Sequence, residues 1–314
     1  MIEGQENVTW EQWVELAKAC EEHGFDALFR SDHYLSFDHP KEWGNLDAWT
    51  TLAGLAATTE RIRLGTLVSP VTFRHPSILT KSVLTVDHIS GGRVEVGLGA
   101  GWFEGEHTAF GFQFGTNRER FEILEEQVQI IHQLMEREVD EVSFEGTHYQ
   151  LEGAPALPKS IQDPHPPLII GGRGGSFGLH LAAWWADEYN VFGIGPDACR
   201  PVRKALDARC AEAERDPSEV RLSTMTGIVV GSDQKDLEAR ASRLMEHLGE
   251  KGDVREFIET WRGDRRLVGT VDQVLERMAH FADAGVERIM LQHLVHEDLE
   301  TIALIGTEII PAKL

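Results

Sequence analysis

The chain has 314 residues, of which 41% are hydrophobic, and it carries a formal net charge of −22. This acidity argues against partners such as nucleic acid or an anionic membrane surface, because both need basic patches. No run approaches the ~20 apolar residues of a membrane span, and the first residues lack a signal-peptide pattern. Three scattered cysteines without a CxxC pair predict neither disulfides nor a zinc site. We therefore expect a cytoplasmic protein without a metal.

The first half of the chain alternates between helical and strand-like patterns. Apolar residues at spacings of three and four indicate helices, and short apolar runs after turn residues indicate buried strands. In chain order these are a helix at 10–23, a strand at 25–31, a helix at 48–59, a strand at 62–68, a helix at 77–89, a strand at 94–98 and a helix at 117–137. Such alternation with short connections predicts a parallel sheet.

Residues 142–166 interrupt this alternation. The segment VSFEGTHYQLEG predicts a β-hairpin that turns around Gly146, and a proline-rich segment follows it. We interpret the region around 140–166 as an insertion over the top or side of the sheet rather than as a domain boundary.

Alternation resumes at residue 167. The predicted elements are a strand at 167–170, a helix at 176–186, a strand at 188–192, a helix at 197–214, a strand at 222–230, a helical stretch at 234–262, a helix at 271–284, a strand at 288–291 and a helix at 299–310. Gly249 and Gly252 within the helical stretch suggest a second insertion, around 234–265.

These segments give seven strands, and a closed (β/α)8 barrel needs eight. The remaining strand can only precede the first helix, where Met1–Gly4 is available. We predict an α/β fold in which residues 1–314 form a single (β/α)8 TIM barrel with insertions and a first strand that looks truncated. An open doubly wound sheet is the alternative.

The clearest binding motif is Gly171–Ser176, GGRGGS, between a predicted strand and a helix. Such a turn presents unpaired backbone N–H groups and the positive end of a helix dipole, and Arg173 adds a charge that can bind phosphate. We favour a phosphate site for a phosphorylated cofactor over a plain tight turn, which needs fewer glycines.

A second glycine-rich segment, RVEVGLGAG, ends the strand at 94–98. Gly97, Gly99 and Gly101 alternate there and would let a flat ligand lie against bare backbone. The segment does not match the GxGxxG dinucleotide motif, because Trp102 and Glu104 stand where glycine is required.

Several polar residues follow predicted strands, where TIM-barrel sites gather. His33 could shuttle a proton, or could form a structural pair with Asp32. Glu106 faces the expected pocket, although a solvated surface acid is slightly favoured. For His293 and His296, a solvated loop is favoured over a metal site.

Five blocks of the chain together carry a family resemblance. In chain order they are HGFDALFRSDH, RIRLGTLVSPVTFRHP, ISGGRVEVGLGAGWFEGEHTAFG, PPLIIGGRGGS with LAAWWADEYN, and GVERIMLQHL. Their order and spacing resemble the bacterial luciferase-like superfamily of flavin- and deazaflavin-dependent (β/α)8-barrel enzymes. Within it, the chain is most similar to the coenzyme F420-dependent oxidoreductases.

The resemblance implies a noncovalently bound F420, with FMN as the alternative, and places His33 near the redox-active edge of its ring. It implies that the strand at 62–68 ends in a bulge, often with a cis non-proline peptide, at Thr66–Leu67 or its neighbour. The implied cofactor-binding residues are His33, Thr66, Leu67, Val68, Gly99, Gly101, Trp102, Gly171, Gly172, Arg173 and Gly174.

The chain also departs from the family's sugar-phosphate dehydrogenases. Phe37 stands where they carry a tryptophan, Trp102 replaces an acid, and Glu6 matches another acid. Catalytic candidates are therefore His33, Glu106 and Glu6, beside an aromatic pocket that suits a flat or hydrophobic substrate.

The expected function is hydride transfer between F420 and a small organic molecule, in a homodimer. An FMN-dependent monooxygenase that uses O2 and a non-catalytic flavin-binding barrel are the alternatives.

Overall fold

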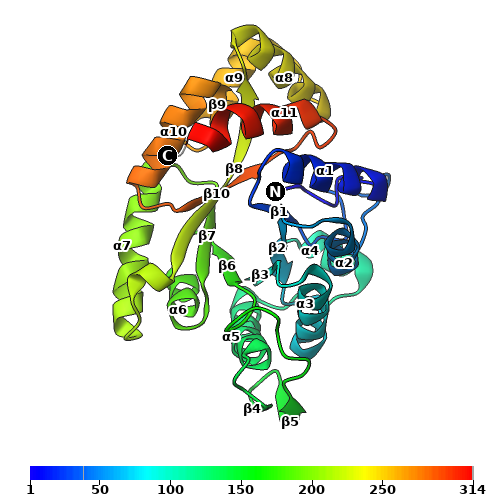
Figure 1. The fold of residues 1–314 in the computed structure, drawn as a ribbon, viewed down its shortest axis with the longest axis vertical. Coiled ribbons are helices and arrows are strands. Elements are labelled where there is room, and N and C mark those ends of the chain that lie inside the picture. Colours follow the sequence, from blue (N-terminus) through cyan, green and yellow to red (C-terminus); the bar gives the residue numbers. More distant parts are fainter. Residues whose placement is uncertain (38, 313–314) are drawn as a thin grey trace.

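The computed structural model describes residues 1–37 and 39–312. Residue 38, in the loop after the first predicted strand, lies outside this description. Strands and helices alternate along the chain (Figure 1), and all seven predicted strands occur within two residues of their expected ends. The strands of the main sheet are β1 (Ala27–Arg30), β2 (Arg63–Pro70), β3 (Val94–Gly99), β6 (Leu168–Gly172), β7 (Glu188–Phe192), β8 (Arg221–Gly231), β9 (Leu267–Thr270) and β10 (Arg288–Gln292).

The helices also follow the predicted pattern, and two of the long ones, α1 (Trp10–Glu22) and α5 (Asn117–Met135), begin at capping boxes. Thr9 and Thr116 each form a reciprocal capping box with the residue three positions later. The helices are α1 (Trp10–Glu22), α2 (Ala48–Thr58), α3 (Pro76–Ser90), α4 (Glu104–Phe110), α5 (Asn117–Met135), α6 (Ser176–Trp185), α7 (Pro196–Glu212), α8 (Gln234–His247), α9 (Val254–Arg262), α10 (Val271–Asp283) and α11 (Leu299–Leu304).

The described strands form a parallel sheet in the order β1-β2-β3-β6-β7-β8-β10, with β9 paired to the far half of β8. Met1 and Ile2 lie between the two outer strands of this order. Ile2 N donates to Phe29 O of β1 at 3.0 Å, and the amino group of Met1 donates to Leu291 O of β10 at 2.8 Å. The short first segment thus hydrogen bonds to β1 on one side and to β10 on the other. This is the position in which a barrel needs its remaining strand.

Charged side chains fill the barrel interior at the amino ends of its strands. Glu95 pairs with Arg63 and with Arg288, whose Nη1 is 2.7 Å from Glu95 Oε2 and 3.1 Å from Glu188 Oε2. Burial opposes ionisation of Glu95, but Arg288 and then Arg63 lower the pKa of this carboxyl. Above these charges lies an apolar layer that includes Phe29, and the side chains of this layer pack against one another. The interior is therefore a packed core, as in other barrels of this size.

Two peripheral units extend from the barrel. β4 (Glu141–Glu145) and β5 (Gln150–Pro155) form the predicted antiparallel hairpin beside α5. The helical stretch at 234–262 is divided into α8 and α9, since Gly249 and Gly252 both adopt positive φ. These helices pack with β8 and β9 around a second apolar cluster, at the opposite end of the molecule from the hairpin (Figure 1).

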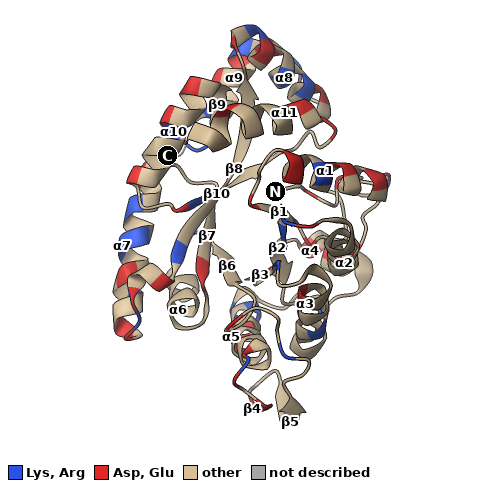
Figure 2. Cartoon of the chain, viewed as in Figure 1, with Lys and Arg blue, Asp and Glu red and all other residues tan. Residues whose placement is uncertain are grey.

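Charges of both signs lie on several outer helices, among them α7 and α8, and also mark several strands (Figure 2). Among the described residues, no helix is both long and apolar enough to cross a bilayer.

The charged layer makes a prediction for stability. Replacement of Arg288 with Met should lower the free energy of unfolding at pH 7 by about 3–5 kcal/mol, because two buried carboxylates lose a shared partner. Because the pKa of Glu95 is lowered in the folded state, its stabilising contribution is present above its unfolded pKa of about 4.3 and is lost as the pH falls through the folded value. The variant should therefore show a shallower loss of stability on acidification, measured by urea unfolding from pH 7 to pH 3.

Arg118 is a matched control, because it forms an ion pair with Glu122 on the surface of α5. Arg118→Met should leave the free energy of unfolding nearly unchanged. Equal losses in the two variants, or an unaltered acid slope in Arg288→Met, would contradict the assigned role of the charged layer.

Candidate active site

The carboxyl ends of the strands bring the predicted site residues to one face of the barrel. His33 follows β1, Val68 lies near the end of β2, and Gly99 ends β3. Gly171 lies at the end of β6, the next strand in the sheet. Because the strands are parallel, these ends share one face, which is where TIM barrels carry their sites.

A buried carboxylate holds His33. The Nδ1 atom of His33 lies 2.7 Å from Glu106 Oε1, and Glu106 Oε2 accepts the backbone N–H of Tyr34 at 2.9 Å. Glu106 is fully buried in α4, so the interpretation of this residue as a solvated surface acid is wrong. A carboxylate only accepts hydrogen bonds, so opposite Glu106 the neutral tautomer of His33 that fits carries its proton on Nδ1 and leaves Nε2 as an acceptor.

Aromatic rings surround the imidazole of His33. Its centroid lies 4.9 Å from that of Phe37, 5.8 Å from Trp102 and 6.5 Å from Phe103, all edge-on. Trp102 is 63% exposed and Phe37 is 37% exposed, so apolar surface next to His33 faces solvent. Such surface suits a flat organic ligand.

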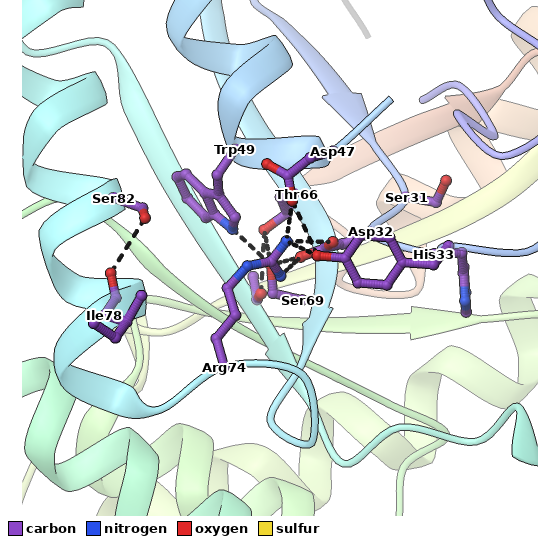
Figure 3. A network of polar contacts seen from close by, with 12 residues as sticks. Ser31, Asp32, His33, Asp47, Trp49, Thr66, Ser69, Arg74, Ile78 and Ser82 are labelled. Atoms are coloured by element: carbon purple, nitrogen blue, oxygen red, sulfur yellow. Dashed lines mark hydrogen bonds and ion pairs between the residues drawn. The ribbon is translucent and has the colours of Figure 1, made fainter. Parts of the chain in front are cut away.

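Asp32 belongs to a different cluster from His33. Its Oδ2 accepts hydrogen bonds from Arg74 Nη1 and from Ser69 Oγ, both at 2.6 Å. Arg74 Nη2 also donates to Tyr34 Oη and to Asp47 Oδ2, each at 2.7 Å (Figure 3). The possible structural pair between Asp32 and His33 is therefore not formed, because each residue has another partner.

This cluster is strongly ionic. Although burial opposes it, the Thr50 backbone N–H and Arg74 lower the pKa of Asp47 to about 2. Burial also disfavours the charge on Arg74, but Asp32 raises the pKa of that guanidinium. The cluster continues into β2, where Ser69 Oγ donates to Asp32, accepts from Trp49 Nε1 at 3.0 Å and lies 3.2 Å from Thr66 Oγ1 (Figure 3).

β2 is irregular between Thr66 and Ser69. Its pairing with β3 shifts register there, and the Leu67–Val68 peptide bond is cis, at the neighbouring position to Thr66–Leu67. Thr66 is buried and Leu67 packs in the barrel interior, whereas Val68 is only half-buried. Of the three predicted ligand residues on this strand, Val68 is thus the one at the mouth of the barrel.

The glycines of the neighbouring strands make room for Val68. A Cβ atom on Gly97, Gly99 or Gly171 would lie 2.9 Å, 2.6 Å or 3.0 Å from a methyl group of Val68. Gly97 could not carry one in any case, since it would also lie 2.3 Å from Thr66 O. The Val68 side chain therefore lies against these glycines, and the expected contact of a ligand with the Gly97 and Gly99 backbone stays a prediction.

The GGRGGS segment forms the turn from β6 into α6. Gly175 is the N-cap residue of α6 and no side chain caps this helix, so its first N–H groups have no side-chain partner. Arg173 is exposed, with its guanidinium 4.5 Å from the Phe192 ring centroid. The arrangement of free N–H groups, dipole and cation fits a phosphate.

The glycines of this turn also have packing roles. A Cβ atom on Gly172 would lie 2.4 Å from Tyr189 Oη, and one on Gly174 would lie 2.8 Å from Val202. The Gly174 N–H already donates to Tyr189 Oη at 3.0 Å. Gly172 and Gly174 are therefore needed for packing, whether or not the turn binds a ligand.

Glu6 lies at the same face but is engaged with the loop after β1. Its Oε2 accepts from Ser36 Oγ at 2.6 Å, and its Oε1 accepts from the Phe37 backbone N–H at 3.1 Å. Gly101 adopts a positive φ beside Thr72, whose Oγ1 lies 2.6 Å from His107 Nε2. The Glu6 contacts fix the loop that carries Phe37, and the Thr72–His107 contact fixes the segment that carries Trp102.

His293 and His296 were expected in a solvated loop, and this expectation is wrong. The two residues are 9% and 5% exposed. His293 Nε2 lies 3.1 Å from Asp298 O, and burial lowers the pKa of its imidazole to about 4. Both residues follow the carboxyl end of β10, but their side chains are buried there.

Comparison with known proteins extends this description. A sequence profile of the family described as luciferase-like monooxygenase matches residues 2–288. The chain belongs to this family. It is 30% identical over 311 residues to an F420-dependent glucose-6-phosphate dehydrogenase from Microbacterium testaceum, covering 93% of this chain and 90% of that protein.

Two further relatives represent the breadth of the luciferase-like family. The chain is 30% identical over 267 residues to pyrimidine monooxygenase RutA from Stutzerimonas stutzeri, covering 82% of this chain and 69% of that one. The F420-dependent tetrahydromethanopterin reductase from Methanopyrus kandleri superimposes with a TM-score of 0.79 at 22% identity, covering 99% of this chain and 97% of the reductase. This likeness confirms the predicted barrel fold.

The pairing of His33 with Glu106 predicts a change of tautomer. In Glu106→Gln, the side-chain carbonyl can accept the Tyr34 N–H, which turns the amide NH2 toward His33 Nδ1. We expect Nδ1 to become an acceptor and Nε2 to carry the proton in the neutral ring. Long-range 1H–15N NMR of histidine-labelled protein measures this, with the signal assigned by its absence in His33→Gln.

The matched control is Glu104→Gln, an exposed acid on the first turn of α4. It should leave the His33 signal unchanged. A His33 ring with the same tautomer in wild type and Glu106→Gln would contradict the assignment.

Proposed function

We propose that this chain is an F420-dependent oxidoreductase that transfers a hydride between the deazaflavin and a small organic molecule. Three features lie together at one face of a luciferase-like barrel, and this observation carries the proposal. They are the His33–Glu106 pair, Val68 in the irregular part of β2, and the uncapped start of α6. The first supports proton transfer, the second offers an apolar support for a flat ring, and the third fits a phosphate.

The chain's residues have separate tasks in this proposal. Val68 supports one face of the ring, and Arg173 with the first N–H groups of α6 holds the phosphate. When bound, F420 supplies a hydride acceptor or donor at its C5 carbon. His33 exchanges a proton with the substrate through Nε2, while Glu106 fixes its orientation. The remaining cofactor-site candidates, Gly99, Gly101 and Trp102, border the ring.

The substrate class follows from the wall next to His33. Phe37, Trp102 and Phe103 are aromatic, and both carboxylate oxygens of Glu6 bind the neighbouring loop. We therefore assign Glu6 a positioning role and propose flat or hydrophobic substrates such as enones and aromatic compounds, rather than sugar phosphates. The homodimer that the family resemblance implies stays a prediction.

An FMN-dependent monooxygenase is the second candidate, since the chain is 30% identical to a pyrimidine monooxygenase as well as to an F420-dependent dehydrogenase, although over a shorter match. A phosphate site at α6 fits either cofactor. The buried partner of His33 argues against a non-catalytic barrel, because a binding protein has no need of an oriented imidazole.

A side-by-side fluorescence titration of the apoprotein with F420 and with FMN tests the proposal. We expect F420 to bind at least about tenfold more tightly, a difference of roughly 1.4 kcal/mol. The reverse preference would contradict it and favour the monooxygenase, whose activity is then measured by oxygen consumption with a flavin reductase.

The same titration tests the phosphate site. Arg173→Met should weaken cofactor binding about tenfold, because a charge-assisted contact is lost. Arg200→Met is the control, since Arg200 is an exposed cation on α7 that donates to Asp283 O. Equal effects of the two variants would place the phosphate elsewhere.

A further inference from the structure

A group of metal-ligating side chains lies at the amino ends of β6 and β7, away from the face that carries His33. His132 is in the last turn of α5, and Glu136 caps its carboxyl end. His165 comes from the proline-rich segment that leads into β6. One donor atom from each of these three residues lies within 4.8 Å of the other two.

The backbone holds these three donors in place without help from an ion. His132 and Glu136 are four residues apart, and the Glu136 N–H donates to His132 O at 3.0 Å, so both side chains share one face of the helix. The Arg137 N–H donates to Pro164 O at 3.1 Å and so fixes the residue before His165. The site is therefore largely preformed.

The orientation of His165 suits a metal ligand. Its Nδ1 lies 2.9 Å from Pro166 O and, facing a carbonyl, carries the proton. Nε2 is then a free acceptor, and it faces Glu136 Oε2 at 4.0 Å. Ligating histidines in proteins usually donate their second ring N–H to a carbonyl or carboxylate in this way.

The spacing distinguishes this group from a hydrogen-bonded pair. A separation of 4.0 Å between His165 Nε2 and Glu136 Oε2 is too long for a hydrogen bond. Bonds of about 2.0–2.2 Å to a shared zinc ion would place its ligand atoms roughly 3–4 Å apart. Small side-chain rotations would bring the donors to those distances.

We propose that His132, Glu136 and His165 form a binding site for a divalent transition metal, with Zn²⁺ as the best match to two imidazoles and one carboxylate. The donors line an open cavity of about 490 Å³, which leaves room for a water molecule as a fourth ligand. The ion would join the end of α5 to the segment before β6. A stabilising role follows, because this is the amino-end face of the barrel.

The expectation that the protein holds no metal rested on its cysteines and on His293 and His296, not on these three residues. His132 and His165 are distant in the sequence, and the region between them includes the hairpin insertion. Only the fold brings them together.

Binding of Zn²⁺ to tag-free, chelator-treated protein tests the proposal by isothermal titration calorimetry. We expect one equivalent to bind and to raise the melting temperature. Loss of an outer-shell partner alone weakens metal sites about 10–100-fold, so His132→Ala and His165→Ala should each weaken binding by about 100-fold or more. Absence of saturable binding to the wild-type protein would overturn the proposal.

His88→Ala is the control, because exposed His88 also contacts the proline-rich segment, through Lys159 O at 2.8 Å, but lies outside the three-donor group. It should retain full zinc affinity. Equal affinity in all three variants would also overturn the proposal. If the alanine variants do not fold, anomalous diffraction at the zinc edge from wild-type crystals decides: a peak between the three donors supports the site, and a peak elsewhere or none refutes it.

Discussion

The buried ion pair between Asp32 and Arg74 is the contact on which the candidate active site most depends. The side chains of Asp32 and Arg74 are 1% and 11% exposed, so each charge relies on the other for compensation. Through Ser69 the pair reaches the irregular part of β2, and through Asp47 it reaches the start of α2. One cluster thereby fixes the residue next to His33 and the strand that carries Val68, which are far apart in the sequence.

The sequence predicts the fold well because its signals are local and repeated. Seven strands and most helices have apolar runs that are long enough to be recognised, and caps or turn glycines mark their ends. The elements that escaped prediction, α4 and β9, have seven and four residues, and their stability comes from tertiary contacts rather than from their own pattern. The barrel likewise depends on a two-sided pairing of Met1 and Ile2 that no local pattern encodes.

The residues of the candidate site also divide into those that a local sequence signal predicts and those that only the fold brings together. His33 and the GGRGGS turn could be recognised because strand ends and glycine-rich turns have sequence signals. The partner of His33 could not, since Glu106 is 73 residues away and becomes buried only when α4 forms. The roles of Arg74 and Asp47 were also missed, although Arg74 lies in the short loop between the second strand and α3. The alternate glycines were noticed, but what they accommodate is the Val68 side chain, a contact between neighbouring strands.

The most direct test of the proposed site is a crystal structure of the protein with F420 bound. Our account predicts the deazaflavin ring against Val68, its edge toward His33, and the phosphate within hydrogen-bond distance of the first N–H groups of α6. A ring bound away from the carboxyl ends of β2 and β3, or a phosphate away from α6, would contradict it.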